Sequence, residues 1–192
     1  MKGASDKRVL FLEAAIGLIG DEGLNGFTTP KVARRAGLRQ SHLTYYFPTR
    51  EDLLVAVAER VVTDRIATLG AVAAARTPAA KVRSLAAILV DPEQTRLLLA
   101  LIQTADRVTQ VAGAFDRLRT GIAPGSEALL RAWRIDATAD ALQLLQATST
   151  GIAVLALAND GPAFRRAAER ILSRLLRELS ASPSRPRTGP TT

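Results

Sequence analysis

The chain has 192 residues, no cysteine, one histidine and a formal net charge of +8. The lack of cysteine excludes disulfides, thiolate zinc sites and cysteine nucleophiles, and the single histidine, His42, excludes ordinary histidine-rich metal sites. Alanine, leucine and arginine dominate, aromatic residues make up only 4%, and alternating β-branched runs are missing, so we expect an all-α protein. The charge favours a polyanionic partner, although a basic solvated surface would give the same balance.

Neither a membrane span nor a signal peptide is evident. The apolar run 151–158 is short and is followed by Asn159 and Asp160, whereas a spanning helix needs about 20 apolar residues. The polar start, Met1–Arg8, lacks the apolar centre of a signal peptide. We therefore expect a cytoplasmic protein without membrane contact, built as one compact unit that carries a small head.

The first predicted helix covers about residues 6–22 and follows a flexible arm, residues 1–5. Its apolar face consists of Leu12, Ala15, Ile16 and Ile19, and Gly23 ends it. Basic residues at its start could reach a phosphate or could simply be solvated.

Two short helices with a tight turn follow, and they carry the sharpest signal in the chain. Thr29 suits an N-cap and Pro30 the first helical position, while Gly37 ends this helix. The second helix fits 40–46 and ends at Phe47-Pro48, because the residue before a proline avoids the α region. This is the spacing of a helix-turn-helix.

The second of these helices has a polar and aromatic outer face. A rotation of about 100° per residue places Leu43 and Phe47 inward, Ser41 and Tyr45 outward, and His42 and Thr44 on the flanks. The charged residues between Gly23 and Phe47 are all basic: Lys31, Arg34, Arg35 and Arg39. Such a surface suits a phosphate backbone.

Six further segments are predicted to be helical or largely so. Thr49 with Asp52 resembles a capping box and opens a connector helix that ends between Gly70 and Arg76. Thr77-Pro78 and Asp91-Pro92 open two more helices, of which the second, strongly apolar, is expected to be buried on most sides. Between 108 and 136 either one kinked helix or two short ones would fit. An antiparallel pair, about 137–158 and 162–180, follows, and the tail 182–192 is expected to be disordered.

The N-terminal part resembles the TetR family of bacterial transcriptional regulators. The family pattern is a helix with Leu-x-Ala-Ala, a glycine, and a helix-turn-helix closing in aromatic-Phe-Pro-Ser-Lys-Glu-x-Leu. The resemblance covers roughly residues 8–57 and is carried by Leu12-Glu13-Ala14-Ala15, Gly23, Thr28-Thr29, Val32-Ala33, Ala36-Gly37-Leu38, Leu43, Tyr45 and Phe47-Pro48-Thr49-Arg50-Glu51-Asp52-Leu53-Leu54.

This resemblance implies an all-α homodimer that binds a palindromic double-stranded DNA operator and a small-molecule effector. Residues 6–52 would form the DNA-binding domain and 53–181 a helical regulatory and dimerisation domain, with no cofactor. The DNA-binding residues would be Thr29, Lys31, Arg39, Gln40, Ser41, His42, Thr44, Tyr45 and Arg50. Thr44 stands where the family often has an aromatic phosphate contact, and Tyr46 is expected to pack under the helix rather than touch DNA.

The regulatory half offers two sets of candidates. A ligand pocket could be lined by Leu98, Leu101, Ile102, Phe115, Leu130, Trp133, Gln143 and Gln146, although apolar residues at helical spacing more often belong to the core. A dimer interface could use Ile152, Leu155, Phe164, Ala167, Ile171 and Leu175, because the last helix pair is too apolar to stay exposed. The same pair could instead pack on the connector helix.

Together these features predict a ligand-responsive DNA-binding regulator. We expect a repressor that is released from its operator by a small, largely apolar ligand. The alternative is a dimeric DNA-binding or assembly protein without a ligand pocket. An enzyme is the weakest hypothesis, since no catalytic residues, metal constellation or phosphate-binding glycine loop are evident.

Overall fold

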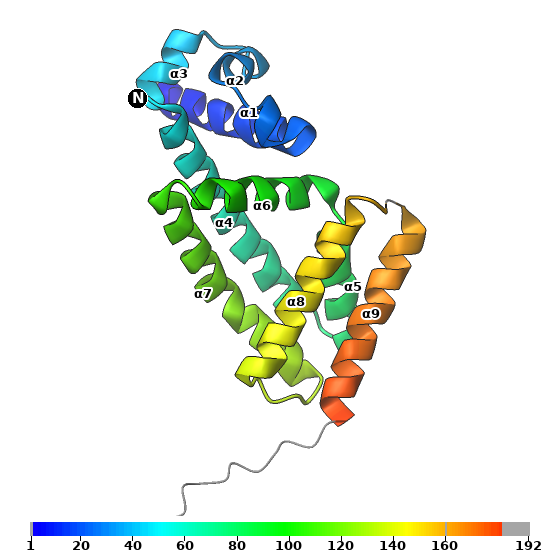
Figure 1. The fold of residues 1–192 in the computed structure, drawn as a ribbon. Helices are drawn as coiled ribbons and strands as arrows, with labels where there is room; N and C mark the ends of the chain where they lie inside the picture. Colours follow the sequence, from blue (N-terminus) through cyan, green and yellow to red (C-terminus); the bar gives the residue numbers. More distant parts are fainter. Residues whose placement is uncertain (1, 160, 182–192) are drawn as a thin grey trace, which may run out of the picture. The chain divides into compact units, whose positions relative to one another are not determined.

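The computed structural model describes residues 2–159 and 161–181. In these ranges the chain forms nine helices and no strand, so the all-α prediction is confirmed (Figure 1). The helices are α1 (Lys2–Gly26), α2 (Thr29–Arg35), α3 (Gln40–Tyr46), α4 (Arg50–Ala74), α5 (Pro78–Leu89), α6 (Pro92–Ala105), α7 (Thr109–Ala132), α8 (Ala139–Ala156) and α9 (Pro162–Ala181). The predicted tail, 182–192, lies outside the described residues, and within them no helix has the length and hydropathy to cross a membrane.

The helices belong to two compact units. The first unit contains Met1–Leu69 and Asp91–Ile122, and the second contains Gly70–Val90 and Ala123–Thr192. The chain therefore passes from the first unit to the second within α4, returns between Val90 and Asp91, and passes to the second unit again within α7. The predicted functional division at residues 52 and 53 is a different one and stays a prediction.

The core of the first unit is built around α1, which packs against α2, α3 and α6. Phe11, Ala15 and Ile19 of α1 are fully buried, as is Val32 of α2, and Leu43 of α3 is 1% exposed. These residues join one continuous apolar cluster that α4 and α6 also enter. The predicted apolar face of α1 and the inward residues of α3 therefore lie in this core, with Phe11 as a central member that the helical pattern did not single out.

The first helix differs from its prediction at both ends. It begins at Lys2 rather than Asp6, so it includes most of the segment expected to form an arm. At Gly23 the backbone adopts φ 70° and ψ −174°, and helical structure resumes as far as Gly26. A conformation of this kind is accessible almost only to glycine. The predicted stop at Gly23 is thus a kink inside a longer element.

Most predicted helix starts are confirmed, with one correction. The N-cap of α2 is Thr28, not Thr29, and its side chain makes no capping hydrogen bond. Thr77, Asp91 and Thr138 cap α5, α6 and α8, and each side chain accepts backbone N–H groups of the first turn. Gly37 has φ 66° directly after α2, as a glycine C-terminal stop requires.

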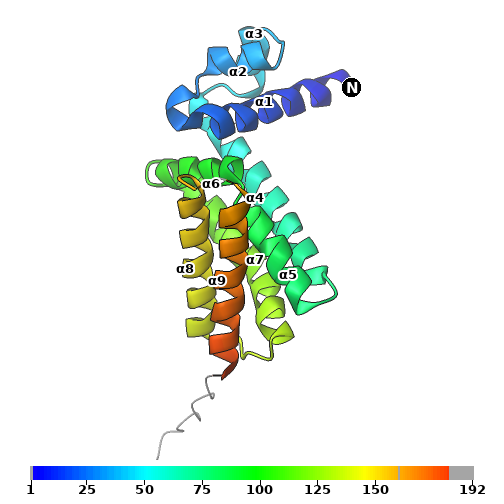
Figure 2. The same ribbon diagram turned by 90° about the vertical axis from the view of Figure 1, so that its right-hand side faces the viewer.

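In the second unit α8 and α9 run antiparallel and side by side, as predicted (Figures 1 and 2). Both also contact α5. Ala168, Leu172 and Leu176 of α9 are fully buried. The spacing of four residues places them on one helical face, which forms the core of this unit.

For the middle of the chain, the structure decides between two alternatives for residues 108–136 and corrects the expected burial of α6. The segment expected to be one kinked helix or two short ones is the single helix α7, with Pro124 inside it. The α6 helix is not buried on most sides, since Ile102 is 47% exposed and Gln103 is also exposed. Its buried face is formed by Leu97, Ala100 and Leu101.

Candidate nucleic-acid interface

The α3 helix presents one polar and aromatic face to solvent. Leu43 is 1% exposed and Phe47, at the helix end, is 3% exposed, so these two side chains anchor the helix. Tyr45 is 81% exposed, and Gln40 and Ser41 are exposed as well. The predicted orientation of this helix is therefore confirmed. Its outward groups can donate and accept hydrogen bonds, as base edges and phosphates require.

Two aromatic contacts hold the end of α3 in place. The Tyr46 ring lies 6.3 Å from the Phe11 ring, centroid to centroid, and contributes to the apolar cluster of the first unit. Tyr45 meets Tyr46 edge-on at 5.1 Å. The packing interpretation of Tyr46 is confirmed, and Tyr46 in turn supports the ring of Tyr45 from one side.

The flanking residues of α3 are more constrained. The Thr44 hydroxyl donates to the Gln40 carbonyl oxygen at 3.1 Å, which leaves its oxygen lone pairs free to accept. His42 is partly buried, and its Nδ1 atom is buried without a hydrogen-bond partner among the described residues. The solvent-facing side of α3 is thus formed by Gln40, Ser41 and Tyr45, and Thr44 is exposed at the edge of this side.

Of the basic residues predicted around the motif, two are paired with carboxylates of α1. The Lys31 Nζ atom lies 2.6 Å from Glu22 Oε2, and Arg35 Nη1 lies 2.7 Å from Asp21 Oδ2. These pairs were not predicted, because both carboxylates precede Gly23, where the stretch with only basic charges begins. The acidic dipeptide immediately before that glycine was the signal that could have revealed them. Arg34 and Arg39 are exposed.

Arg50 contacts the same small core from outside. Its guanidinium carbon lies 5.3 Å from the centroid of the Phe27 ring, a cation–π contact. The side chain remains exposed at the first residue of α4. Thr29, the last of the predicted contacts, is partly buried at the start of α2.

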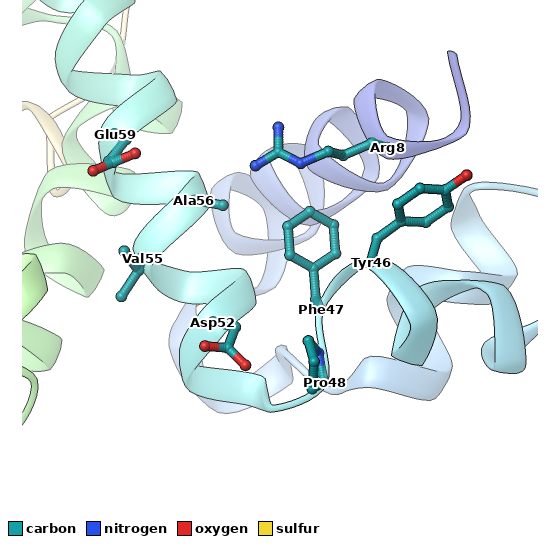
Figure 3. A pocket seen from close by; sticks show the side chains of 8 residues that line it. All are labelled: Arg8, Tyr46, Phe47, Pro48, Asp52, Val55, Ala56 and Glu59. Carbon is teal, nitrogen blue, oxygen red and sulfur yellow. The ribbon is translucent and has the colours of Figure 1, made fainter. Parts of the chain in front are cut away.

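A shallow groove of about 360 Å³ lies beside the end of α3. Figure 3 shows the Arg8 side chain extending over the Phe47 ring, and its guanidinium carbon is 5.2 Å from the ring centroid. The opposite wall is formed by α4, with Asp52, Val55, Ala56 and Glu59. The groove thus belongs to the support of α3 rather than to its outward face.

The predicted ligand residues are divided between the two units. Leu98, Leu101, Ile102 and Phe115 belong to the first unit, and Leu130, Trp133, Gln143 and Gln146 to the second. Leu101 and Leu130 are buried, whereas Ile102, Gln143 and Gln146 are exposed. The role of this set stays a prediction.

The predicted dimer residues all lie on α8 and α9, but they differ in exposure. Leu155 is 55% exposed and Ile171 is 44% exposed, while Phe164, Ala167 and Leu175 are partly buried. Ile152 is only 3% exposed and therefore already belongs to the core of the second unit. A shallow groove lined by Ala158, Asn159, Ala163, Phe164 and Ala167 lies at the turn between these helices.

Residues 11–57 match the sequence profile of a family described as bacterial regulatory proteins, tetR family. The matched range contains most of α1, all of α2 and α3, and the start of α4. Residues 11–57 form a TetR-family N-terminal domain. The profile therefore covers every residue of the candidate interface, and the helix-turn-helix assigned from spacing is the TetR one.

Two curated TetR-family relatives and one solved structure extend this assignment. The chain is 29% identical over 133 residues to the HTH-type transcriptional regulator BetI of Rhizobium meliloti (strain 1021), covering 64% of this chain and 66% of BetI. It is 31% identical over 70 residues to the HTH-type transcriptional regulator RutR of Escherichia coli (strain K12), covering 36% of this chain and 33% of RutR. The chain thus aligns with less than two thirds of either relative.

The crystal structure of the multidrug binding protein EbrR complexed with ethidium superimposes on this chain with a TM-score of 0.62 and 28% identity, covering 88% of this chain and 97% of EbrR. The likeness extends beyond the residues that the TetR profile matches. The structural likeness to EbrR therefore also covers helices that follow the helix-turn-helix.

Proposed function

We propose that this chain is a DNA-binding transcriptional regulator whose α3 helix enters the major groove. The observation that carries the proposal is the outward face of α3, where Tyr45 is 81% exposed while Leu43 of the same helix is 1% exposed. Apart from its edge-on contact with Tyr46, this large aromatic side chain faces solvent and contributes little to packing. Placed in the groove, the same face can contact base edges and phosphates.

The salt dependence of DNA binding tests this proposal directly. Lys31, Arg39 and Arg50 are the cations proposed to contact phosphates, and each contact releases about 0.9 counterion from the duplex. Two heads with three contacts each correspond to a slope of about −5 in a plot of log K against log salt. An affinity that does not fall as salt rises would place the DNA face elsewhere.

We further propose that the regulator binds a palindromic operator as a homodimer. Support comes from exposed apolar side chains on α8 and α9, namely Val154, Leu155 and Ile171 at 44%, 55% and 44%. Burial against a symmetry-related copy would remove this surface from water. Two heads about 34 Å apart, or a small multiple of that distance, would meet half-sites in successive major grooves.

The effector would be a small, largely apolar molecule that favours a head spacing unable to match the operator. Support comes from the likeness to EbrR, which was crystallised with ethidium. In this chain the Trp133 Nε1 atom is buried and has no hydrogen-bond partner among the described residues, so a ligand acceptor could satisfy it. Such a repressor would act in the bacterial cytoplasm. The ligand can shift the equilibrium between the operator-binding state and the released state only by as much as its affinities for these two states differ.

Thermal unfolding in the presence of apolar compounds distinguishes this regulator from an assembly protein without a pocket. A true effector must raise the unfolding temperature, because it binds the folded chain and not the unfolded one. The same compound must weaken operator binding. A compound library that produces neither effect would favour the assembly role.

A further inference from the structure

Two carboxylates of α1 form ion pairs with two cations of α2. Glu22 Oε2 lies 2.6 Å from Lys31 Nζ, and Asp21 Oδ2 lies 2.7 Å from Arg35 Nη1. Both pairs join the segment before the kink at Gly23 to the first helix of the motif. Lys31 is one of the proposed phosphate contacts, so its ammonium already has an anionic partner in the free protein.

Both pairs lie against glycines of α1. A Cβ at Gly26 would lie 2.6 Å from Glu22 Oε2, and a Cβ at Gly17 would lie 2.7 Å from Arg35 Nη2. A side chain at either position would collide with one member of its pair.

We infer that Glu22 is an intramolecular competitor of DNA phosphate for Lys31. This inference rests on the proposed function and adds to it a residue that limits affinity. In the Lys31–Glu22 pair both side chains are about half exposed, at 45% and 43%, and exposed pairs of this kind contribute little to stability. A phosphate can therefore replace the carboxylate, but Glu22 stays close to the new partner and repels it. The result is weaker binding to every duplex, since phosphate contacts carry no sequence information.

The test uses the full-length protein and a mixed-sequence duplex of about 30 base pairs, long enough for a dimer on half-sites one turn apart. Binding is followed by fluorescence anisotropy for wild type, Glu22→Gln, Lys31→Gln and the double variant. Glu13→Gln is the matched control, because Glu13 is exposed on the same helix and loses the same charge. Thermal unfolding of each variant checks that the fold is retained.

Glu22→Gln is expected to tighten binding about two- to five-fold at low salt, the range that an exposed ion pair allows. The gain should exceed that of Glu13→Gln and should shrink as salt screens the competing charges. It should largely disappear when Lys31 is already glutamine. A change in stability alone would not depend on salt or on Lys31 in this way.

Two results would overturn the inference while leaving the proposed function intact. Weaker binding by Glu22→Gln would mean that Glu22 positions Lys31 instead of competing for it. An equal gain with and without Lys31 would mean a general repulsion of DNA by the carboxylate. A wild-type protein that shows no salt-sensitive binding would instead reject the proposed function, and with it the competition.

Discussion

Thr49 and Asp52 cap the start of α4 reciprocally. The Thr49 backbone N–H and hydroxyl donate to Asp52 Oδ2 at 2.9 and 2.8 Å, and the Asp52 N–H donates to the Thr49 hydroxyl at 3.0 Å. Thr49 follows Pro48 and the α3 C-cap, Phe47, so this cap fixes where the connector helix α4 begins.

Removal of either partner of the cap should destabilise the fold. Thr49→Ala and Asp52→Ala are each expected to lower the free energy of unfolding by about 1 kcal/mol. The first N–H groups of a helix have no acceptor within the helix, and the cap supplies one. Urea unfolding measures the loss. Thr49→Ser keeps the hydroxyl and should retain most of the stability, and a serine variant as unstable as the alanine variant would argue against the cap.

Substitutions at two residues of α3 should affect operator affinity and protein stability separately. Tyr45→Ala is expected to weaken operator binding about 5- to 100-fold without lowering the unfolding temperature, because its side chain is 81% exposed. Leu43→Ala should instead cost about 2–5 kcal/mol of stability through the cavity it leaves. Binding isotherms and thermal unfolding of both variants make the comparison. Unchanged operator affinity in Tyr45→Ala would show that α3 does not reach the groove.

The helix-turn-helix was predictable because its determinants are local. Gly37, Pro48 and the Thr49–Asp52 cap each act within a few residues, and the spacing of Leu43 and Phe47 defines the inner face of α3. The same reasoning placed Tyr45 outward and Tyr46 in the packing. The fold class and the orientation of the motif therefore followed from the sequence.

Contacts that depend on tertiary structure were not predictable in the same way. The Lys31–Glu22 pair joins side chains nine residues apart across a kink and a turn. Pro124 left one kinked helix and two short helices open as alternatives. The single helix α7 forms, because a proline removes one helical hydrogen bond and burial of Leu129 and Leu130 in the next turns can offset that loss. Apolar spacing in α6 likewise did not reveal that Ile102 is exposed.

Two glycine-to-alanine substitutions should have opposite effects on stability. Gly23→Ala is expected to destabilise the fold by about 1–3 kcal/mol, because the residue has φ 70° and ψ −174°. A Cβ there would meet no atom within 4 Å, so backbone strain is the whole cost. Gly70→Ala lies within α4, also without a neighbour within 4 Å, and should stabilise by about 0.5–1 kcal/mol. Chemical unfolding gives both values, and a neutral Gly23→Ala would mean that the kink is not required.

A charge placed on the exposed apolar face of α8 and α9 should prevent dimerisation. Leu155 and Ile171 are 55% and 44% exposed, so glutamate at either position is tolerated by a monomer but unfavourable in an apolar interface. We expect Ile171→Glu to sediment as a monomer at concentrations where the wild type is a dimer. Ala71→Glu, at an exposed position of α4, is the matched control and should remain dimeric. The monomeric variant should also lose most of its operator affinity, because a single head forfeits the second half-site. A dimeric Ile171→Glu would place the interface on another surface of the second unit.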